Sequence, residues 1–253
     1  MVWACCCAIA AATTAAAAQA PDKKSDPFAI LDNSFLVEEA FNQEAHVFQN
    51  ILNVQRTGAS DLNFTFTQEW PLGSIKHQLS YTVALANQVV SGEREFSRGA
   101  MALNYRFQLA NETTSAPAIS PRLSLLFPPA GDGNKLGLQL NVPASKQFGD
   151  FYVHLNAGYT INNLGSSSAL DRQRTAAASL IYRVLPMFNL MLESTFATHQ
   201  YAFESSWYLS PGFRVGKNIG KKQVVFGLAV PMGLLDLDDK HSLFGYLSYE
   251  LPF

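Results

Sequence analysis

Hydrophobic and polar residues alternate along most of the chain, from about residue 46 to its end. In "LGLQLNV", for example, Leu136, Leu138 and Leu140 alternate with Gln139 and Asn141. A period of two indicates a β-strand with one apolar and one polar face. The same period is present in "LNFTFT", "MALNYRFQL", "PRLSLLF", "FYVHLNAGY", "FNLMLESTF", "WYLSPGFRV" and "VVFGLAV", and more weakly in "VFQNILNVQ", "QLSYTVA" and "AASLIYRV". With the C-terminal segment, the pattern predicts about twelve strands.

The segments between these strands are rich in residues that favour chain reversal. "TGAS", "PLGS", "PPAGDGN", "GKNIG" and "LPM" supply Gly, Pro, Asn and Asp. Longer loops are predicted near 86–96, 160–173, 197–205 and 232–241, and shorter turns at 71–74, 145–149, 185–187 and 216–222. Long and short connections alternate, so we expect them on opposite rims of one meandering antiparallel sheet.

Two architectures are compatible with such strands. A soluble sandwich or barrel turns its apolar faces inward, whereas a membrane barrel turns them toward lipid. Only 15% of the residues are charged, 48% are hydrophobic, and the polar faces carry mostly Asn, Gln, Ser, Thr, Gly and Ala. This composition suits an enclosed, wet interior better than a surface exposed to water. Aromatic residues are frequent on the apolar faces, as in the aromatic girdles of membrane barrels: Tyr105, Phe107, Phe127, Phe151, Tyr159, Tyr182, Phe188, Phe196, Trp207, Phe213 and Tyr249.

The sequence therefore predicts an all-β protein, a transmembrane antiparallel up-and-down β-barrel of about twelve strands over residues 46–253. Strands of about 9–11 residues match a tilted bilayer crossing. The sheet must close, because an open edge would leave backbone groups unpaired in hydrocarbon. The expected location is the bacterial outer membrane, with its lipid as a partner.

The N-terminal residues suggest export. Residues 1–20, "MVWACCCAIAAATTAAAAQA", combine an apolar stretch with small residues before "PDKK", which is typical of a cleaved signal peptide, although a buried Ala-rich helix is the alternative. Cys5, Cys6 and Cys7 all lie within it. Residues 21–45 are predicted to form a periplasmic segment. In "DNSFLVEEAFNQEAH", the candidate caps Asn33 and Ser34 favour a short helix, which would lie at the barrel mouth or fold into the lumen as a plug, with a mobile leader as the alternative.

The C-terminal strand ends on an aromatic residue. Leu247, Tyr249, Leu251 and Phe253 alternate along "HSLFGYLSYELPF". This pattern resembles the terminal strand of bacterial outer-membrane barrels, which the barrel assembly machinery recognises. We therefore expect that machinery as a partner.

Several segments together resemble a family of bacterial outer-membrane proteins described as transporters, or as relatives of the MetA-pathway phenol-degradation family. They are "SFLVEEAFNQEAHVFQN", "FTFTQEWPLGSIKHQLSYT", "LNYRFQL", "PRLSLLFPPAGD" and "GLQLNVPASK", and the resemblance spans about residues 33–253. It implies an outer-membrane barrel with a role in transport. The matching motifs are structural and not catalytic.

Charged residues on the polar faces are the candidate lumen lining. About twelve strands would enclose a narrow pore. Opposed arginines and glutamates there would create a field that selects polar or anionic solutes, or would pair with one another and fill the interior. The candidates are Glu69, Arg106, Arg122, His154, Arg183, Glu193, Arg214 and Glu250.

Motifs for catalysis, metals and cofactors are not evident in the sequence. The five histidines are dispersed, and Asp236, Asp238 and Asp239 lack the spacing of a calcium loop. Near-neutral net charge (-2) gives no reason to expect nucleic acid as a partner. We therefore predict a narrow channel or transporter for small solutes, not an enzyme. The alternatives are a non-conducting structural or binding barrel with a filled lumen and, third, an outer-membrane hydrolase using His154 with Ser124 or Asn156.

Overall fold

The computed structural model describes residues 29–30, 32–58, 61–90, 93–129, 135–164, 170–199, 205–235 and 241–253. The predicted signal peptide and the acidic loop with Asp236, Asp238 and Asp239 lie outside these residues. Within the described part of the chain, no helix is long and apolar enough to cross a lipid bilayer.

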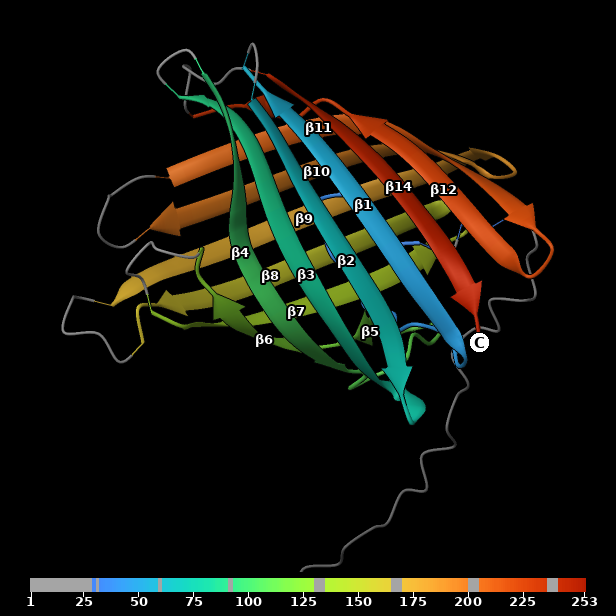
Figure 1. The fold of residues 1–253 in the computed structure, drawn as a ribbon. Coiled ribbons are helices and arrows are strands. Elements are labelled where there is room, and N and C mark those ends of the chain that lie inside the picture. Colours follow the sequence, from blue (N-terminus) through green and yellow to red (C-terminus); the bar gives the residue numbers. More distant parts are fainter. Residues whose placement is uncertain are drawn as a thin grey trace, which may run out of the picture.

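The fold is one closed antiparallel barrel (Figure 1). Of the fourteen strands among the described residues, β5 (Ala118–Ile119) and β13 (Met232–Gly233) have two residues each, and the other twelve form the wall. The ring closes where β1 pairs with β14 from Val47↔Pro252 to Thr57↔Ser242. The predicted barrel is confirmed. The wall strands are β1 (Val47–Thr57), β2 (Asp61–Leu72), β3 (Ser74–Val90), β4 (Glu93–Phe107), β6 (Arg122–Phe127), β7 (Gly137–Phe148), β8 (Phe151–Asn162), β9 (Asp171–Leu185), β10 (Phe188–His199), β11 (Ser205–Ile219), β12 (Lys222–Ala229) and β14 (Ser242–Pro252).

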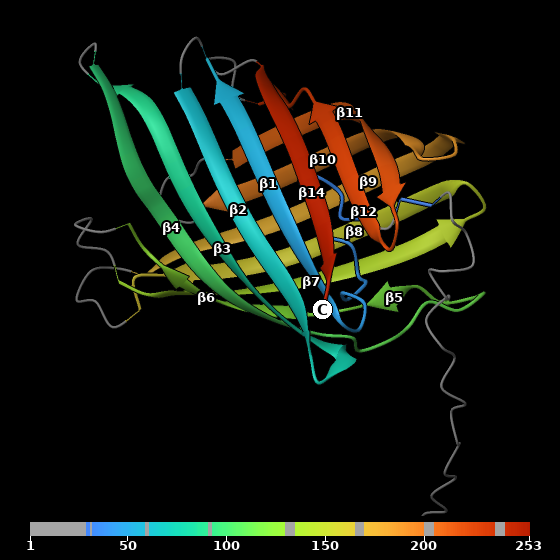
Figure 2. The same cartoon turned by 45° about the vertical axis from the view of Figure 1, so that its right-hand side comes forward.

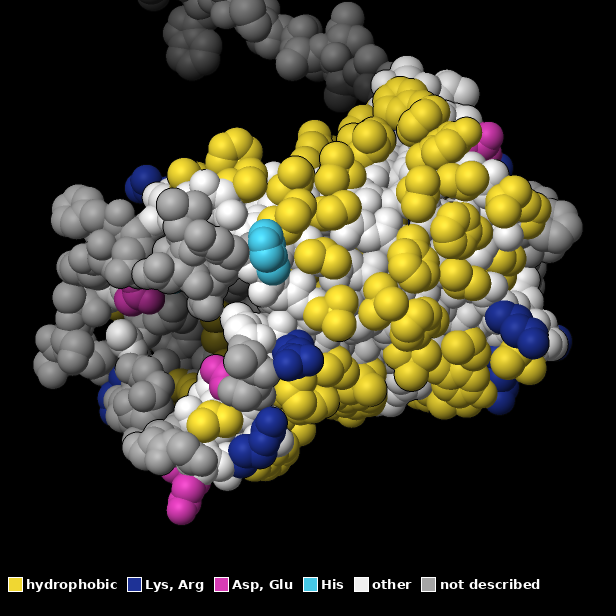
Figure 3. Space-filling model, turned by 90° about the horizontal axis from the view of Figure 1, so that it is seen from above, with side chains coloured by type: hydrophobic (Ala, Val, Ile, Leu, Met, Phe, Trp, Pro, Cys, Tyr) yellow, Lys and Arg dark blue, Asp and Glu magenta, His cyan; other side chains and the backbone are white. Residues whose placement is uncertain are grey.

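The two faces of the wall have opposite chemistry. Along β10, Leu190 and Leu192 are exposed on the outside, whereas Asn189, Met191 and Glu193 are buried inside. Hydrophobic side chains cover much of the face shown in Figure 3, and charged side chains lie toward its ends. An exterior of this kind is stable only against hydrocarbon, because contiguous apolar patches of this extent are rare on soluble proteins.

Replacing Leu192 by arginine tests this orientation. Leu192 lies within β10, beside Leu180 of β9 and Pro211 of β11. A charge there would lie in hydrocarbon, so we expect Leu192→Arg to lower the free energy of unfolding in lipid vesicles by about 2–4 kcal/mol. Leu185→Arg, at the exposed end of β9, is the matched control and should cost about 0–1 kcal/mol. Equal costs in urea titrations would contradict the assignment of the lipid face.

The β3–β4 connection is shorter than predicted. The expected loop at 86–96 is mostly strand, since β3 continues to Val90 and β4 begins at Glu93, with Val89 paired to Arg94. The charged residues at 93–95 are exposed and are compatible with an extended backbone. β6 pairs with β4 only from Arg106↔Arg122 to Met101↔Phe127. The first half of β4 therefore has β3 as its one partner strand among the described residues.

Residues 29–44, of which residue 31 is not described, lie inside the barrel, and we call them the inner segment (Figure 2). Ile30, Phe35 and Val37 are buried there. The predicted short helix is not formed, because the described residues of this segment are bends and irregular chain. Several of its backbone N–H groups, among them those of residues 35–38, donate to side chains of the wall.

Candidate functional site

A buried carboxylate on the wall holds the middle of the inner segment. Glu193 of β10 is fully buried, and its Oε1 accepts the backbone N–H groups of Phe35 (3.1 Å), Leu36 (3.1 Å) and Val37 (3.3 Å). Successive N–H groups that converge on one anion form a strong binding concavity. Glu193 therefore fixes the backbone conformation of the inner segment at this point.

A second carboxylate, on the inner segment itself, binds two arginines of the wall. Arg122 Nε lies 2.9 Å from both carboxylate oxygens of Glu38, and Arg106 Nη2 lies 3.1 Å from Oε2. Burial alone would raise the pKa of Glu38, but the guanidinium groups of Arg122 and Arg106 outweigh it and lower this pKa from 4.5 to about 2. Glu38 is therefore ionised at neutral pH.

The third contact region links Glu39 of the inner segment to β11 and β8. Arg214 Nη1 donates to the backbone oxygens of Asp32 (2.6 Å) and Asn33 (3.0 Å) and lies 3.5 Å from Glu39 Oε1. His154 Nε2 lies 3.6 Å from the same Glu39 oxygen.

His154 also makes a hydrogen bond of 2.7 Å between its Nδ1 and Ser145 Oγ. This Ser–His–Glu order is that of a hydrolase triad. However, Ser145 is buried and its Oγ already accepts the N–H of Ala40 at 2.7 Å. The contacts of Ser145 and His154 therefore attach the inner segment to the wall. Ser124 and Asn156, the partners considered from the sequence, bond instead to Arg122 and to Glu38 N–H, respectively.

Asp32 anchors the start of the inner segment in a buried polar cluster. Its carboxylate accepts hydrogen bonds from Tyr246 Oη (2.5 Å), Ser248 Oγ and Gln49 Nε2. Burial raises the pKa of Asp32 above its usual 3.8, although Ser248, Tyr246 and Arg214 act in the opposite direction. The carboxyl group is therefore easier to protonate than a free aspartate.

Apolar residues pack beside this cluster. The Phe35 ring lies 5.1 Å from the Tyr246 ring and 5.8 Å from the Phe244 ring. Gly227 of β12 makes room for it, since a Cβ at this position would overlap the Phe35 ring.

We expect Gly227→Ala to displace Phe35 and to weaken packing of the inner segment by about 1–3 kcal/mol, as overpacked cores do. Gly245→Ala on β14 is the matched control, because a Cβ there meets only atoms 3.8 Å or more away. Limited proteolysis within the inner segment measures the difference. Equal cleavage rates for the two variants would contradict the packing described.

Acid should loosen the Glu38 contact. Because its pKa is lowered in the bound state, the ion pairs contribute fully above pH 4.5 and are lost as the pH falls through about 2. Asp32 acts in the opposite sense, since a raised pKa favours the bound state in acid. We therefore expect protease access to the inner segment to rise more on acidification in wild type than in Glu38→Gln. An identical rise, measured with an acid-active protease, would contradict the role of Glu38.

The predicted lumen residues fall into three groups. Glu69, Arg106 and Arg122 line a common cavity. His154, Glu193 and Arg214 contact the inner segment, as described above. The remaining two are elsewhere: Arg183 binds Asp150 of the β7–β8 turn (Nε–Oδ1 2.9 Å), and Glu250 is half-buried near the end of β14.

The predicted assembly residues lie on the last strand. Leu247, Leu251 and Phe253 are exposed on the outer face, and Tyr249 is half-buried. The Phe253 ring stacks on Phe48 of β1 at 4.2 Å. The closing seam therefore includes the C-terminal residue.

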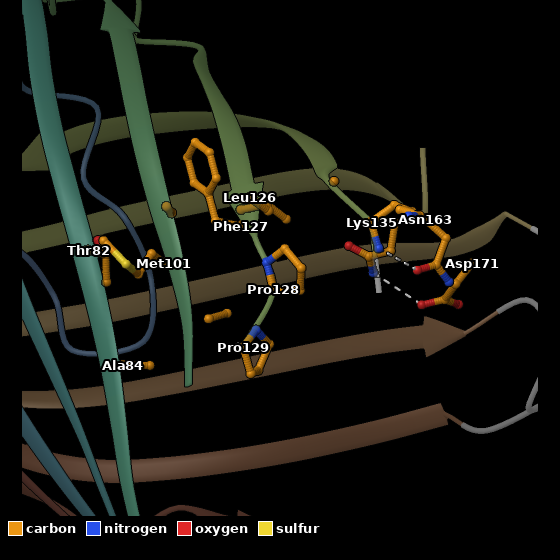
Figure 4. A pocket seen from close by; sticks show the side chains of 14 residues that line it. Thr82, Ala84, Met101, Leu126, Phe127, Pro128, Pro129, Lys135, Asn163 and Asp171 are labelled. Atoms are coloured by element: carbon orange, nitrogen blue, oxygen red, sulfur yellow. Dashed lines mark hydrogen bonds between the residues drawn. The ribbon is translucent and has the colours of Figure 1, made fainter. Parts of the chain in front are cut away.

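Two adjoining cavities lie along β3 and β4. One, of about 510 Å³, lies beside the end of β6 and is lined by Phe127, Pro128 and Pro129 together with Lys135 (Figure 4). The other, of about 310 Å³, is bounded by the inner segment and by Arg106 and Arg122. Thr82 and Ala102 line both. The open space therefore ends against the inner segment.

No family model and no curated protein matches this chain. Among solved structures, the barrel is similar to the NanC porin, with a TM-score of 0.57 and 10% identity over 81% of this chain and 100% of that one. It is also similar to the KdgM porin in complex with disordered oligogalacturonate, with a TM-score of 0.55 and 12% identity over 82% of this chain and 99% of that one. An outer membrane channel from Pseudomonas putida F1 matches with a TM-score of 0.59 and 12% identity over 85% of this chain and 98% of that one. The chain has the fold of a bacterial outer-membrane barrel. At this identity, the likeness shows the fold alone.

Proposed function

We propose that this protein is a narrow channel for small solutes in the bacterial outer membrane, and that the inner segment is its plug. The observation that carries the proposal is the pair of adjoining cavities, which share Thr82 and Ala102, and of which the cavity of about 310 Å³ ends against the inner segment. The apolar exterior and the polar interior support insertion in lipid. The porins and the channel that share the fold support a transport role.

The way in which the inner segment is bound supports a plug that can move. Carboxylate, amide and hydroxyl side chains of the wall accept several of its N–H groups, and each such contact can be replaced by water. A polar interface of this kind separates at lower cost than a dry hydrophobic one. The proposal is thus a channel that is narrow at rest and wider when the plug is displaced.

Residues 1–20 serve in this proposal as the signal peptide, and residues 21–28 as the start of the periplasmic segment. The barrel assembly machinery would bind the last strand through Leu247, Tyr249, Leu251 and Phe253. Membership of the MetA-pathway phenol-degradation family rests on the sequence segments quoted above, and no catalytic step is part of the proposal.

A second candidate is a binding barrel that does not conduct. It is favoured by one observation, which is that the inner segment fills the lumen beneath the cavity of about 310 Å³. The two candidates differ in conductance. Purified protein in planar bilayers should give discrete steps, and liposomes that contain it should swell in sugars or amino acids. Folded protein that gives neither signal, with or without the inner segment, would contradict the channel and favour the binding barrel.

A further inference from the structure

Arg106 and Arg122 lie directly opposite each other on neighbouring strands. They are register partners in the β4–β6 pair, and both side chains point into the lumen. Like charges at directly opposed positions destabilise a sheet. Two buried guanidinium groups in this arrangement require an anion between them. In this structure the anion is Glu38 of the inner segment.

The wall holds the Arg122 guanidinium without help from the inner segment, whereas Arg106 donates to two groups of that segment, Glu38 Oε2 and the backbone oxygen of Phe41. Arg122 donates to Asn104 Oδ1 (2.9 Å), to Gln139 Oε1 (2.9 Å) and to Ser124 Oγ, all of which belong to the wall. Arg106 is buried, and its Nε has no hydrogen-bond partner. If Glu38 left, Arg122 would therefore keep its position on the wall, and Arg106 would have an unused Nε donor.

The adjoining cavity has the dimensions and chemistry for the rest of a ligand. It has a volume of about 310 Å³ and touches both arginines. Apolar atoms of Leu36, Ile51 and Ala102 line it as well. Glu69 also lines the cavity, so without Glu38 two positive charges would face one negative charge. The site would still favour an anion.

We infer that Arg106 and Arg122 bind the carboxylate of a small amphipathic solute, and that Glu38 occupies this site in its absence. A solute carboxylate would replace that of Glu38 and so remove one attachment of the inner segment. The inference rests on the proposed function, because it names the class of solute that the channel takes.

Calorimetric titration of the full chain in non-ionic detergent tests the site, with hexanoate as the probe. Glu38 competes with the probe in wild type, so Glu38→Gln should bind hexanoate about tenfold more tightly. Hexanamide, which has the same length and no charge, should bind to neither protein. Equal hexanoate affinity in the two proteins, or equal affinity for both probes, would overturn the inference.

Glu39→Gln is the matched control, because it removes the neighbouring carboxylate, which contacts Arg214 and His154 instead. Its hexanoate affinity should stay within about twofold of wild type. A gain as large as that of Glu38→Gln would assign the effect to general loosening and overturn the inference. The double variant Glu38→Gln, Arg122→Gln should not bind hexanoate. Heat-modifiable mobility in electrophoresis checks that this variant forms a folded barrel. If it does not, the double variant Glu38→Gln, Arg106→Gln is used in its place.

Conductance separates this inference from the proposed function. Conductance steps in planar bilayers, without hexanoate binding, would support the proposed channel and overturn the carboxylate site. Hexanoate binding that follows the predicted order of variants, without any conductance, would support the site and contradict the channel.

Discussion

Deletion of residues 21–44 should raise the single-channel conductance about three- to tenfold. The interior of a twelve-strand barrel is wider than that of a filled eight-strand barrel and narrower than that of an open sixteen-strand channel, so an emptied lumen should conduct. The deletion removes the segment that bounds the cavity of about 310 Å³. It also removes Asp32, Glu38 and Glu39, which leaves the arginines of the wall without these partners. The open channel should therefore prefer anions over cations.

The measurement is a recording in planar bilayers, with a reversal potential in a salt gradient for ion preference. Deletion of residues 21–28 is the control, because it keeps every lumen contact described above and should leave the conductance unchanged. A folded barrel whose conductance stays the same after deletion of residues 21–44 would contradict the role of the inner segment.

Glu193→Leu should release the middle of the inner segment. The substitution keeps a side chain of similar size but removes the acceptor of three buried N–H groups, those of Phe35, Leu36 and Val37. Hydrogen bonds to a charged group are worth about 1.5–3 kcal/mol each, so even one net loss gives a tenfold to hundredfold weaker attachment.

Amide hydrogen exchange measures this release, since the N–H groups of residues 35–37 should lose their protection by a similar factor. Glu193→Gln keeps one acceptor oxygen and should lose less. Unchanged protection in Glu193→Leu would contradict the hydrogen bonds between Glu193 and residues 35–37. Equal loss of protection in Glu193→Leu and Glu193→Gln would contradict the role of the side-chain oxygen as their acceptor.

The wall of the barrel was predictable because each strand carries its own signal. In β7 and β10 the alternation separates Leu138 and Leu192 from Gln139 and Glu193, and the composition of the polar faces then assigns the leucines to lipid. The rims were harder to predict. Charged residues such as Arg94 suggest a loop, yet outside the hydrocarbon a strand tolerates them, and the pairing of β3 and β4 continues.

The conformation of the inner segment was not predictable from local sequence, although a place in the lumen was one of the predicted alternatives. Asn33 and Ser34 have the chemistry of helix caps, but a helix would compete with Glu193 for the same N–H groups. Glu193 is 158 positions away from Phe35 in the chain, so no local pattern reports it. Glu38 and Glu39 carried the signal that was missed, because acidic residues in a lumen segment complement arginines on the wall.

Apolar side chains of the wall face lipid, and polar ones face the lumen. Spin labels along β10 test this orientation. All natural cysteines lie at positions 5–7, so they can be replaced and single cysteines placed at 189–193. In lipid vesicles, collision rates with dissolved oxygen should be highest for labels at Leu190 and Leu192 and lowest at Asn189, Met191 and Glu193. Maxima at the odd-numbered positions, or rates without alternation, would contradict the orientation of the barrel wall.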